Sequence, residues 1–135
     1  MKSLEILLAV IIGLVASSCT TTSSMMDEPV GSGQEKEFQV PMDELYDISR
    51  ASVQACGLSV EDEQKQEGMF KIVGQVGPDL VSFGSLVRVL GLKRDPNKST
   101  VRVITRARSH ATEWATRTEY ATCIFKAIAD KIQKK

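Results

Sequence analysis

Apolar and polar positions along the first part of the chain repeat with two different periods. Phe38 and Val40 alternate with polar neighbours and predict a short strand, which ends at Pro41. From Pro41 to Gly57 the apolar residues instead fall on one side of a helical projection, and acidic residues occupy the first turn. This stretch therefore predicts a helix that covers a core with one face.

The middle of the chain has the period of two that is typical of strands. The apolar stretches GLSV and MFKIVGQV flank the polar sequence EDEQKQEG, so a hairpin with a hydrophilic loop is predicted. A further strand is predicted in LVSFGSLVRVLGL, and the turn sequence KRDPNKS separates it from a strand in TVRVITRAR. In this last strand Val101 and Val103 share one face, whereas Arg102 and Arg106 share the other.

From about His110 to Ile132 the period changes to that of a helix. The apolar stripe of this helix consists of Ala111, Trp114, Ala115, Thr118, Thr122, Phe125, Ile128, Ala129 and Ile132. The predicted order is thus strand, helix, three or four strands, and helix. Such a chain packs most economically as a two-layer α+β sandwich, with both helices on one face of a largely antiparallel sheet of about four or five strands.

The first 18 residues have the features of a signal peptide. After a short polar start that contains Lys2, the eleven residues from Ile6 to Ala16 carry only apolar side chains or are glycine. A helix that spans a bilayer needs about 20 apolar residues, whereas the apolar region of a signal peptide has about 7–15. Small residues follow as far as Ser18, as a signal peptidase requires, and the next residue is Cys19.

The sequence VIIGLVASSC at this junction resembles the lipobox of bacterial lipoproteins. The resemblance implies cleavage between Ser18 and Cys19 and attachment of acyl chains such as palmitate to Cys19, which would anchor the protein in membrane lipid. Since Thr20 follows the cysteine, the resemblance favours the outer membrane, facing the periplasm, in a cell with two membranes. The alternative is that Cys19 is an incidental residue in a secretory signal that is cleaved nearby.

Residues 20–35, TTTSSMMDEPVGSGQE, show neither helical nor strand periodicity and are rich in serine, threonine and glycine. They predict a flexible linker with a span of roughly 20–25 Å, enough to hold a domain beside a bilayer without docking it. The expected organisation is a signal peptide over 1–18, a lipidated cysteine and flexible linker over 19–35, and a globular α+β domain over 36–135.

Together with the lipobox, this order of elements resembles a group of small α+β envelope lipoproteins of bacteria. The stretches that carry the resemblance are VPMDELYDISRASVQACGLSV, as the first strand, helix and return strand, and TEYATCIFKAIADKI, as the closing helix. The resemblance implies no catalytic residues. The expected protein is therefore not an enzyme but a lipid-anchored structural or interaction module of the cell envelope, whose partners are membrane lipid and another envelope component.

Charge is balanced overall, with 17 basic and 17 acidic residues, but it is divided along the chain. Residues 27–67 contain eleven acidic and three basic residues, whereas residues 68–135 contain thirteen basic and five acidic ones. Four arginines are predicted on the sheet face opposite the helices: Arg88, Arg102, Arg106 and Arg108. This face is either simply solvated or the site of an adaptor for an anionic ligand. Nucleic acid is not expected, because no aromatic residues are interleaved with the bases.

The remaining candidate residues give weak signals. Cys56 lies on the apolar face of the first helix, whereas Cys123 points away from the apolar stripe of the second, so free thiols are favoured and a disulfide stays possible. Ser109 and His110 are the candidates for a secreted hydrolase, although adjacent residues cannot face each other as nucleophile and base, and Ser109 suits a helix N-cap. No metal or other cofactor is expected, because neither metal-ligand spacing nor a nucleotide-binding glycine pattern is present.

Overall fold

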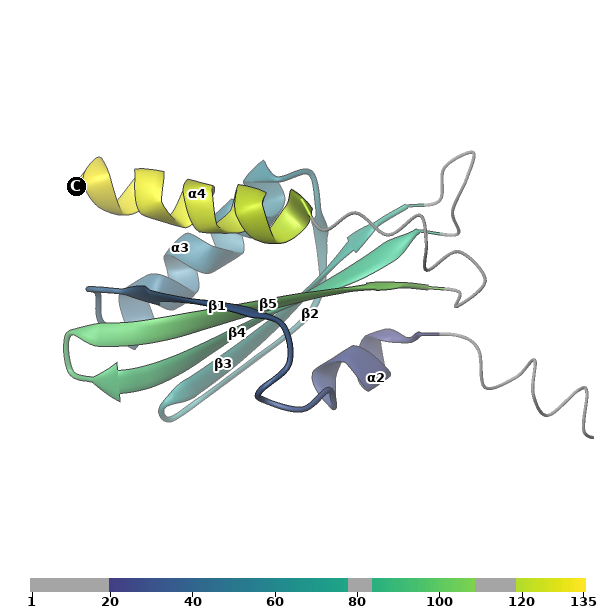
Figure 1. Cartoon of the computed structure of the whole chain (residues 1–135), viewed down its shortest axis with the longest axis horizontal. Coiled ribbons are helices and arrows are strands. Elements are labelled where there is room, and N and C mark those ends of the chain that lie inside the picture. Colours follow the sequence, from purple (N-terminus) through teal and green to yellow (C-terminus); the bar gives the residue numbers. More distant parts are fainter. Residues whose placement is uncertain (1–19, 78–83, 109–118) are drawn as a thin grey trace, which may run out of the picture.

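The computed structural model describes residues 20–77, 84–108 and 119–135, which form a five-stranded antiparallel sheet and three helices (Figure 1). The elements are α2 (Thr22–Met26), β1 (Gln34–Phe38), α3 (Met42–Ala55), β2 (Ser59–Gln66), β3 (Met69–Val76), β4 (Ser85–Asp95), β5 (Lys98–Ala107) and α4 (Glu119–Gln133). Across the sheet the strand order is β1-β5-β4-β3-β2. The predicted α+β sandwich is confirmed, including the order of elements from the first strand to the last helix.

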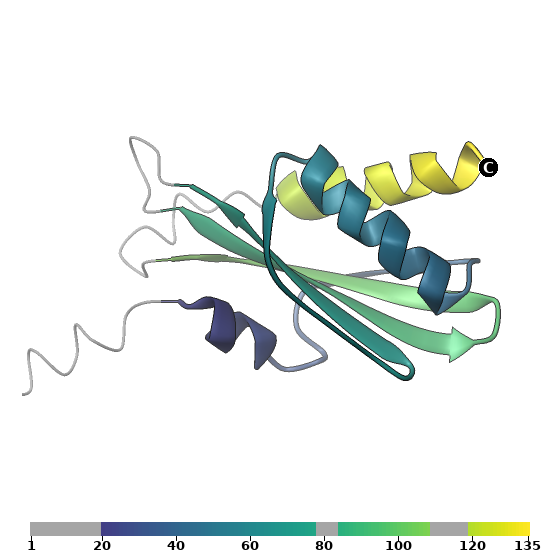
Figure 2. The ribbon, with the colours of Figure 1, turned by 180° about the vertical axis from the view of Figure 1, so that it is seen from behind.

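The two faces of the sheet are covered unequally. Helices α3 and α4 pack on one face, and the short helix α2 lies on the other (Figures 1 and 2). Because side chains alternate along a strand, the same strands supply both cores. The larger core, under α3 and α4, includes Leu45, Phe70, Ile72, Val87, Val89, Val101, Val103, Ile124 and Ile128. The smaller core, under α2, consists of Met25, Val73, Leu86 and Ile104.

Strand β2 corrects the prediction of a hydrophilic loop. The sequence EDEQKQ continues the strand and pairs with β3, and Gly68, with a φ of +77°, lies in the tight turn between them. The side chains of residues 61–66 are exposed. Strand β2 lies at the edge of the sheet, where such charged residues disfavour pairing with another sheet. Glu63 accepts hydrogen bonds from the hydroxyl of Tyr46 and from Nε of Arg50, which lower the pKa of its carboxyl group.

The C-terminal helix is described from Glu119 onward, so Trp114 and the rest of its predicted first part lie outside the described residues. Within α4 the predicted burial of Phe125 and Ile128 is confirmed. Thr122, predicted to belong to the same stripe, is exposed. The buried face instead includes Ala121 and Ile124, and the isoleucine side chain gains more from burial than a threonine does.

A disulfide between Cys56 and Cys123 corrects the expectation of free thiols. Cys123 does point away from the sheet, as its helical projection predicts, and it is exposed. However, α3 crosses beside α4 obliquely, and its C-terminal end rises away from the sheet (Figure 2). Cys56 caps that end, and its Cα atom lies 6.1 Å from that of Cys123. The bond therefore joins the exposed Cys123 to the partly buried C-terminal end of α3, a contact that a projection of one helix cannot reveal.

Candidate functional site

The arginine face of the sheet is covered by residues 20–33, here called the N-terminal strap. Its only helix, α2, begins with a capping box: Thr21 Oγ1 accepts from the N–H of Ser24 at 3.1 Å, and Ser24 Oγ accepts from the N–H of Thr21 at 2.9 Å. The next residue, Met25, is fully buried against Val73 and Leu86. The prediction of a flexible linker over residues 20–35 is therefore wrong, because the strap is packed on the sheet and β1 already begins at residue 34.

Arg88 of β4 holds the end of α2. Its guanidinium group is fully buried and donates hydrogen bonds to the backbone carbonyls of Met25 at 3.3 Å, of Pro29 at 3.1 Å, and of Glu28. Nζ of Lys71 on β3 donates to the last carbonyl of α2 at 2.7 Å. The last carbonyls of a helix have no intrahelical donors, so these two cations satisfy them. Burial lowers the pKa of Arg88, and the nearby charge of Glu28 opposes that shift.

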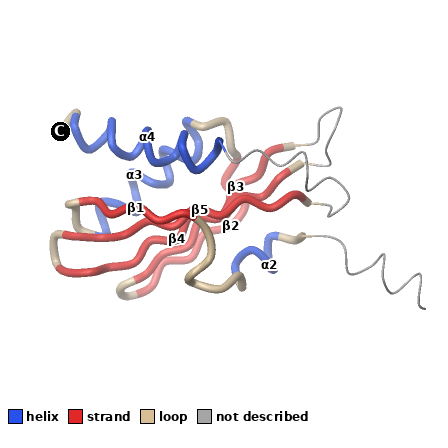
Figure 3. The backbone as a smooth tube through the Cα atoms, in the orientation of Figure 1, coloured by secondary structure: helices blue, strands red, loops and turns tan. Residues whose placement is uncertain are grey.

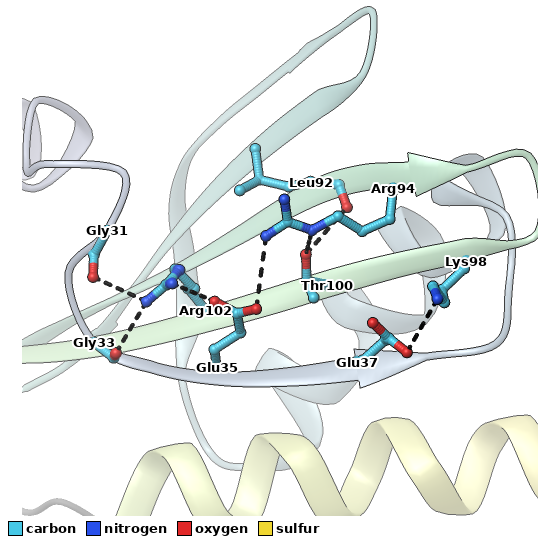
Figure 4. A network of polar contacts seen from close by, with 9 residues as sticks. All are labelled: Gly31, Gly33, Glu35, Glu37, Leu92, Arg94, Lys98, Thr100 and Arg102. Carbon is cyan, nitrogen blue, oxygen red and sulfur yellow. Dashed lines mark hydrogen bonds and ion pairs between the residues drawn. The ribbon is translucent and has the colours of Figure 1, made fainter.

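A row of charged side chains continues from the strap across β4, β5 and β1 (Figure 4). Arg102 stands opposite Glu35 in the register of β5 and β1 and forms an ion pair with it, while Arg94 approaches the same carboxylate at 3.6 Å. Arg102 also donates to the carbonyl of Gly31 at 2.9 Å. At Gly33 the strap turns into β1 with a φ of +92°, and a Cβ atom there would collide with the backbone of β5, so glycine suits this turn.

The strap also brings an acidic side chain to the arginine face. Oε1 of Glu28 lies 3.2 Å from Nε of Arg106, and the N–H of Thr20 donates to the carbonyl of Arg108 at 2.7 Å. The expectation of an open arginine face is therefore wrong. Arg88 is buried, and Arg102 and Arg106 bind acidic groups of the same chain. The division of charge along the sequence is thus partly explained, because Glu28 and Glu35 of the acidic half pair with arginines of β4 and β5.

Truncation of Met25 tests the packing of the strap. We expect Met25→Ala to lower the free energy of unfolding by about 2–3 kcal/mol, because a fully buried side chain is removed and a cavity is left. Met26→Ala is the matched control, since the neighbouring side chain is only partly buried, and it should cost less than about 1 kcal/mol. Urea unfolding followed by circular dichroism measures both values. Equal losses in the two variants would contradict the specific role of Met25.

Two of the hollows on the surface of the described residues are lined in part by charged side chains, and neither has the character of a small-molecule pocket. The larger, of about 500 Å³, lies between α2 and strands β2 and β3, and its lining includes Asp27, Asp62, Glu63 and Lys71. The other, of about 390 Å³, lies beside the start of α3 and includes Asp43, Lys65 and Lys93. Ligand pockets are usually enclosed and mostly apolar with a few convergent polar groups. These hollows are instead open to solvent, and charged side chains stand at the rim of each.

Four residues of the predicted sites lie outside the described residues: Ser18, Cys19, Ser109 and His110. The lipidation site and the Ser109–His110 hydrolase hypothesis therefore stay predictions. Within residues 20–77, 84–108 and 119–135, no three histidine, cysteine or acidic side chains are grouped so that they could hold a metal ion. None of the helices in these ranges is long and apolar enough to cross a membrane.

Comparison with known proteins gives no family assignment: no protein-family model matches the chain, and a search of curated proteins finds no significant match.

Proposed function

We propose that this chain is a lipid-anchored protein of the cell envelope, with a non-enzymatic structural or binding role. The observation that carries the proposal is the apolar run from Ile6 to Ala16, which is followed by two small residues and ends on Cys19. Cleavage before Cys19 and acylation of its sulfur would leave the mature domain attached to lipid. In a cell with two membranes, the outer membrane is the proposed location, with the domain in the periplasm.

The disulfide between Cys56 and Cys123 supports an exported location. Disulfides persist in the periplasm and outside the cell, whereas the thiol pools of the cytosol keep most cysteines reduced. Because Cys123 is exposed, reductants would reach this bond in the cytosol. The bond is thus consistent with a domain that is oxidised after it crosses the inner membrane.

The position of the strap supports cleavage immediately before Cys19. The N–H of Thr20 already donates to the carbonyl of Arg108, the residue that follows β5, and α2 begins two residues later. A cut at the Ser18–Cys19 bond keeps the whole strap, whereas a cut a few residues further along would remove Thr20 and the capping Thr21. The residue that carries the proposed lipid is thus the last one before the packed part of the chain.

Incorporation of labelled palmitate into the full chain, expressed in bacteria, tests the anchor. We expect Cys19→Ala to abolish incorporation, because it removes the sulfur that is acylated. Ser18→Ala is the matched control, since it keeps a small side chain beside the cleavage site and leaves Cys19 in place, so labelling should continue. Mass spectrometry of the mature N-terminal peptide then checks that Cys19 is the first residue and carries the acyl groups.

Two results would contradict the proposal. One is equal labelling of Cys19→Ala and the unchanged chain, and the other is a mature N-terminus that begins at a residue other than Cys19.

A further inference from the structure

We propose that the end of the sheet formed by Thr20, Gly84 and Arg108 rests on the bilayer surface, so that the domain is held there in a fixed orientation. This inference rests on the proposed lipid anchor at Cys19. The proposed partner of this end of the sheet is a lipid surface. A domain held in this way differs from the predicted one, which would hang on a flexible linker of roughly 20–25 Å.

The first step is the distance between the anchor and the sheet. Across one trans peptide bond, the Cα atom of Cys19 lies about 3.8 Å from that of Thr20. The N–H of Thr20 donates to the carbonyl of Arg108 at 2.7 Å, and the N–H of Arg108 donates to the carbonyl of Gly84 at 3.0 Å. The acylated residue is therefore one covalent step from the hydrogen-bonded backbone of the sheet.

The second step is that the N-terminal strap is packed on the sheet and so adds no flexible length between the anchor and the domain. Met25 is buried in the smaller core, and Arg88 and Lys71 bind the carbonyls at the end of α2. Glu28 further pairs with Arg106 on β5. Residues 20–33 could act as a long tether between the bilayer and the domain only if all these contacts were broken together.

The third step is the direction of the sheet. Strand β3 ends, β4 begins and β5 ends at the same end as Thr20, whereas the turn at Pro96 and Asn97 lies at the opposite end (Figure 3). Strand β5 spans ten residues, so at about 3.3 Å per residue its two ends are about 30 Å apart. The partly exposed Arg108 also places a cation at the anchored end, which suits anionic headgroups.

The orientation can be measured by fluorescence quenching from the bilayer. The full-length precursor is expressed, and its lipidated product is placed in vesicles of phosphatidylethanolamine and phosphatidylglycerol, a fraction of which carry a nitroxide on the headgroup. A fluorophore is attached to Gly77→Cys or, separately, to Asn97→Cys, while Cys56 and Cys123 remain in their disulfide. Gly77 is exposed and follows the end of β3, beside the anchored end of the sheet, and a Cβ atom there would meet no neighbour. Because the two positions lie at opposite ends of the sheet and Arg108 is kept, we expect quenching at position 77 to be at least about threefold stronger than at position 97.

Insertion of about twelve glycine and serine residues between Cys19 and Thr20 is the control. The insert adds a tether of roughly 20 Å but leaves the strap and the sheet unchanged, so the difference between the two positions should fall markedly. Equal quenching at both positions without the insert, or stronger quenching at position 97, would overturn the inference. Mass spectrometry of each sample separates the two proposals, since an unmodified Cys19 would overturn the lipid anchor itself and the orientation with it.

Discussion

Arg88→Met is expected to lower the free energy of unfolding by about 3 kcal/mol and to release the N-terminal strap from the sheet. The variant keeps an apolar side chain of similar length but removes the donors to three backbone carbonyls, those of Met25, Glu28 and Pro29. A hydrogen bond from a charged group contributes about 1.5–3 kcal/mol, and a buried acceptor that loses its donor adds a desolvation cost. Water that reaches the strap after release offsets part of the total.

Two measurements check this result together. Urea unfolding gives the loss of stability, and amide hydrogen exchange over residues 21–33 reports whether the strap has opened. Arg94→Met is the matched control on the same strand. The side chain of Arg94 is 45% exposed, and its pair with Glu35 and its hydrogen bond to Thr100 are only partly buried, so it should cost about 1 kcal/mol. Unchanged exchange of the strap in Arg88→Met would show that Arg88 does not hold it.

The second large effect is expected from the loss of the disulfide. A chain that carries both Cys56→Ser and Cys123→Ser should be less stable by about 4 kcal/mol, because the bond closes a loop with a sequence separation of 67 residues and restricts the unfolded chain. For a domain of this size the melting temperature should fall by on the order of 15 °C.

The reductant supplies an internal control for this variant. Dithiothreitol should lower the melting temperature of the unchanged chain by a similar amount and leave the double serine variant unaffected. If both native cysteines react with a maleimide in folded, unreduced protein, the bond is absent and the expected difference in stability disappears.

The spacing of apolar and polar residues along the chain was sufficient to predict the order of strands and helices and the faces that they bury. The alternation of Val101 and Val103 with Arg102 assigned the two faces of β5 correctly, because the period of a strand is a property of neighbouring residues. The same holds for α3, where the acidic first turn and Gly57, with a φ of +83°, mark the helix boundaries in the sequence.

Local pattern misjudged the strap because its strongest contacts are far away in sequence. Arg88 lies 60 residues from Glu28, and Arg106 lies 78 residues from it, so nothing near the strap indicates that its carbonyls and its carboxylate have partners. Its polar composition is typical of a linker. The Thr21–Ser24 capping pair followed by two methionines was the available signal for a short, packed helix.

The sequence by itself determined the periods of the strands and helices, the division between an acidic and a basic half, and the signal-like run that ends on Cys19. Only the tertiary structure decided which partners the charged side chains and the cysteines have, and which of these side chains are buried. Arg88 is buried because a segment from the other end of the chain lies over it, and Cys123 bonds to Cys56 because two helices cross at a particular angle. The physical reason is that backbone periodicity depends on neighbouring residues, whereas burial and pairing depend on distant segments that the fold brings together.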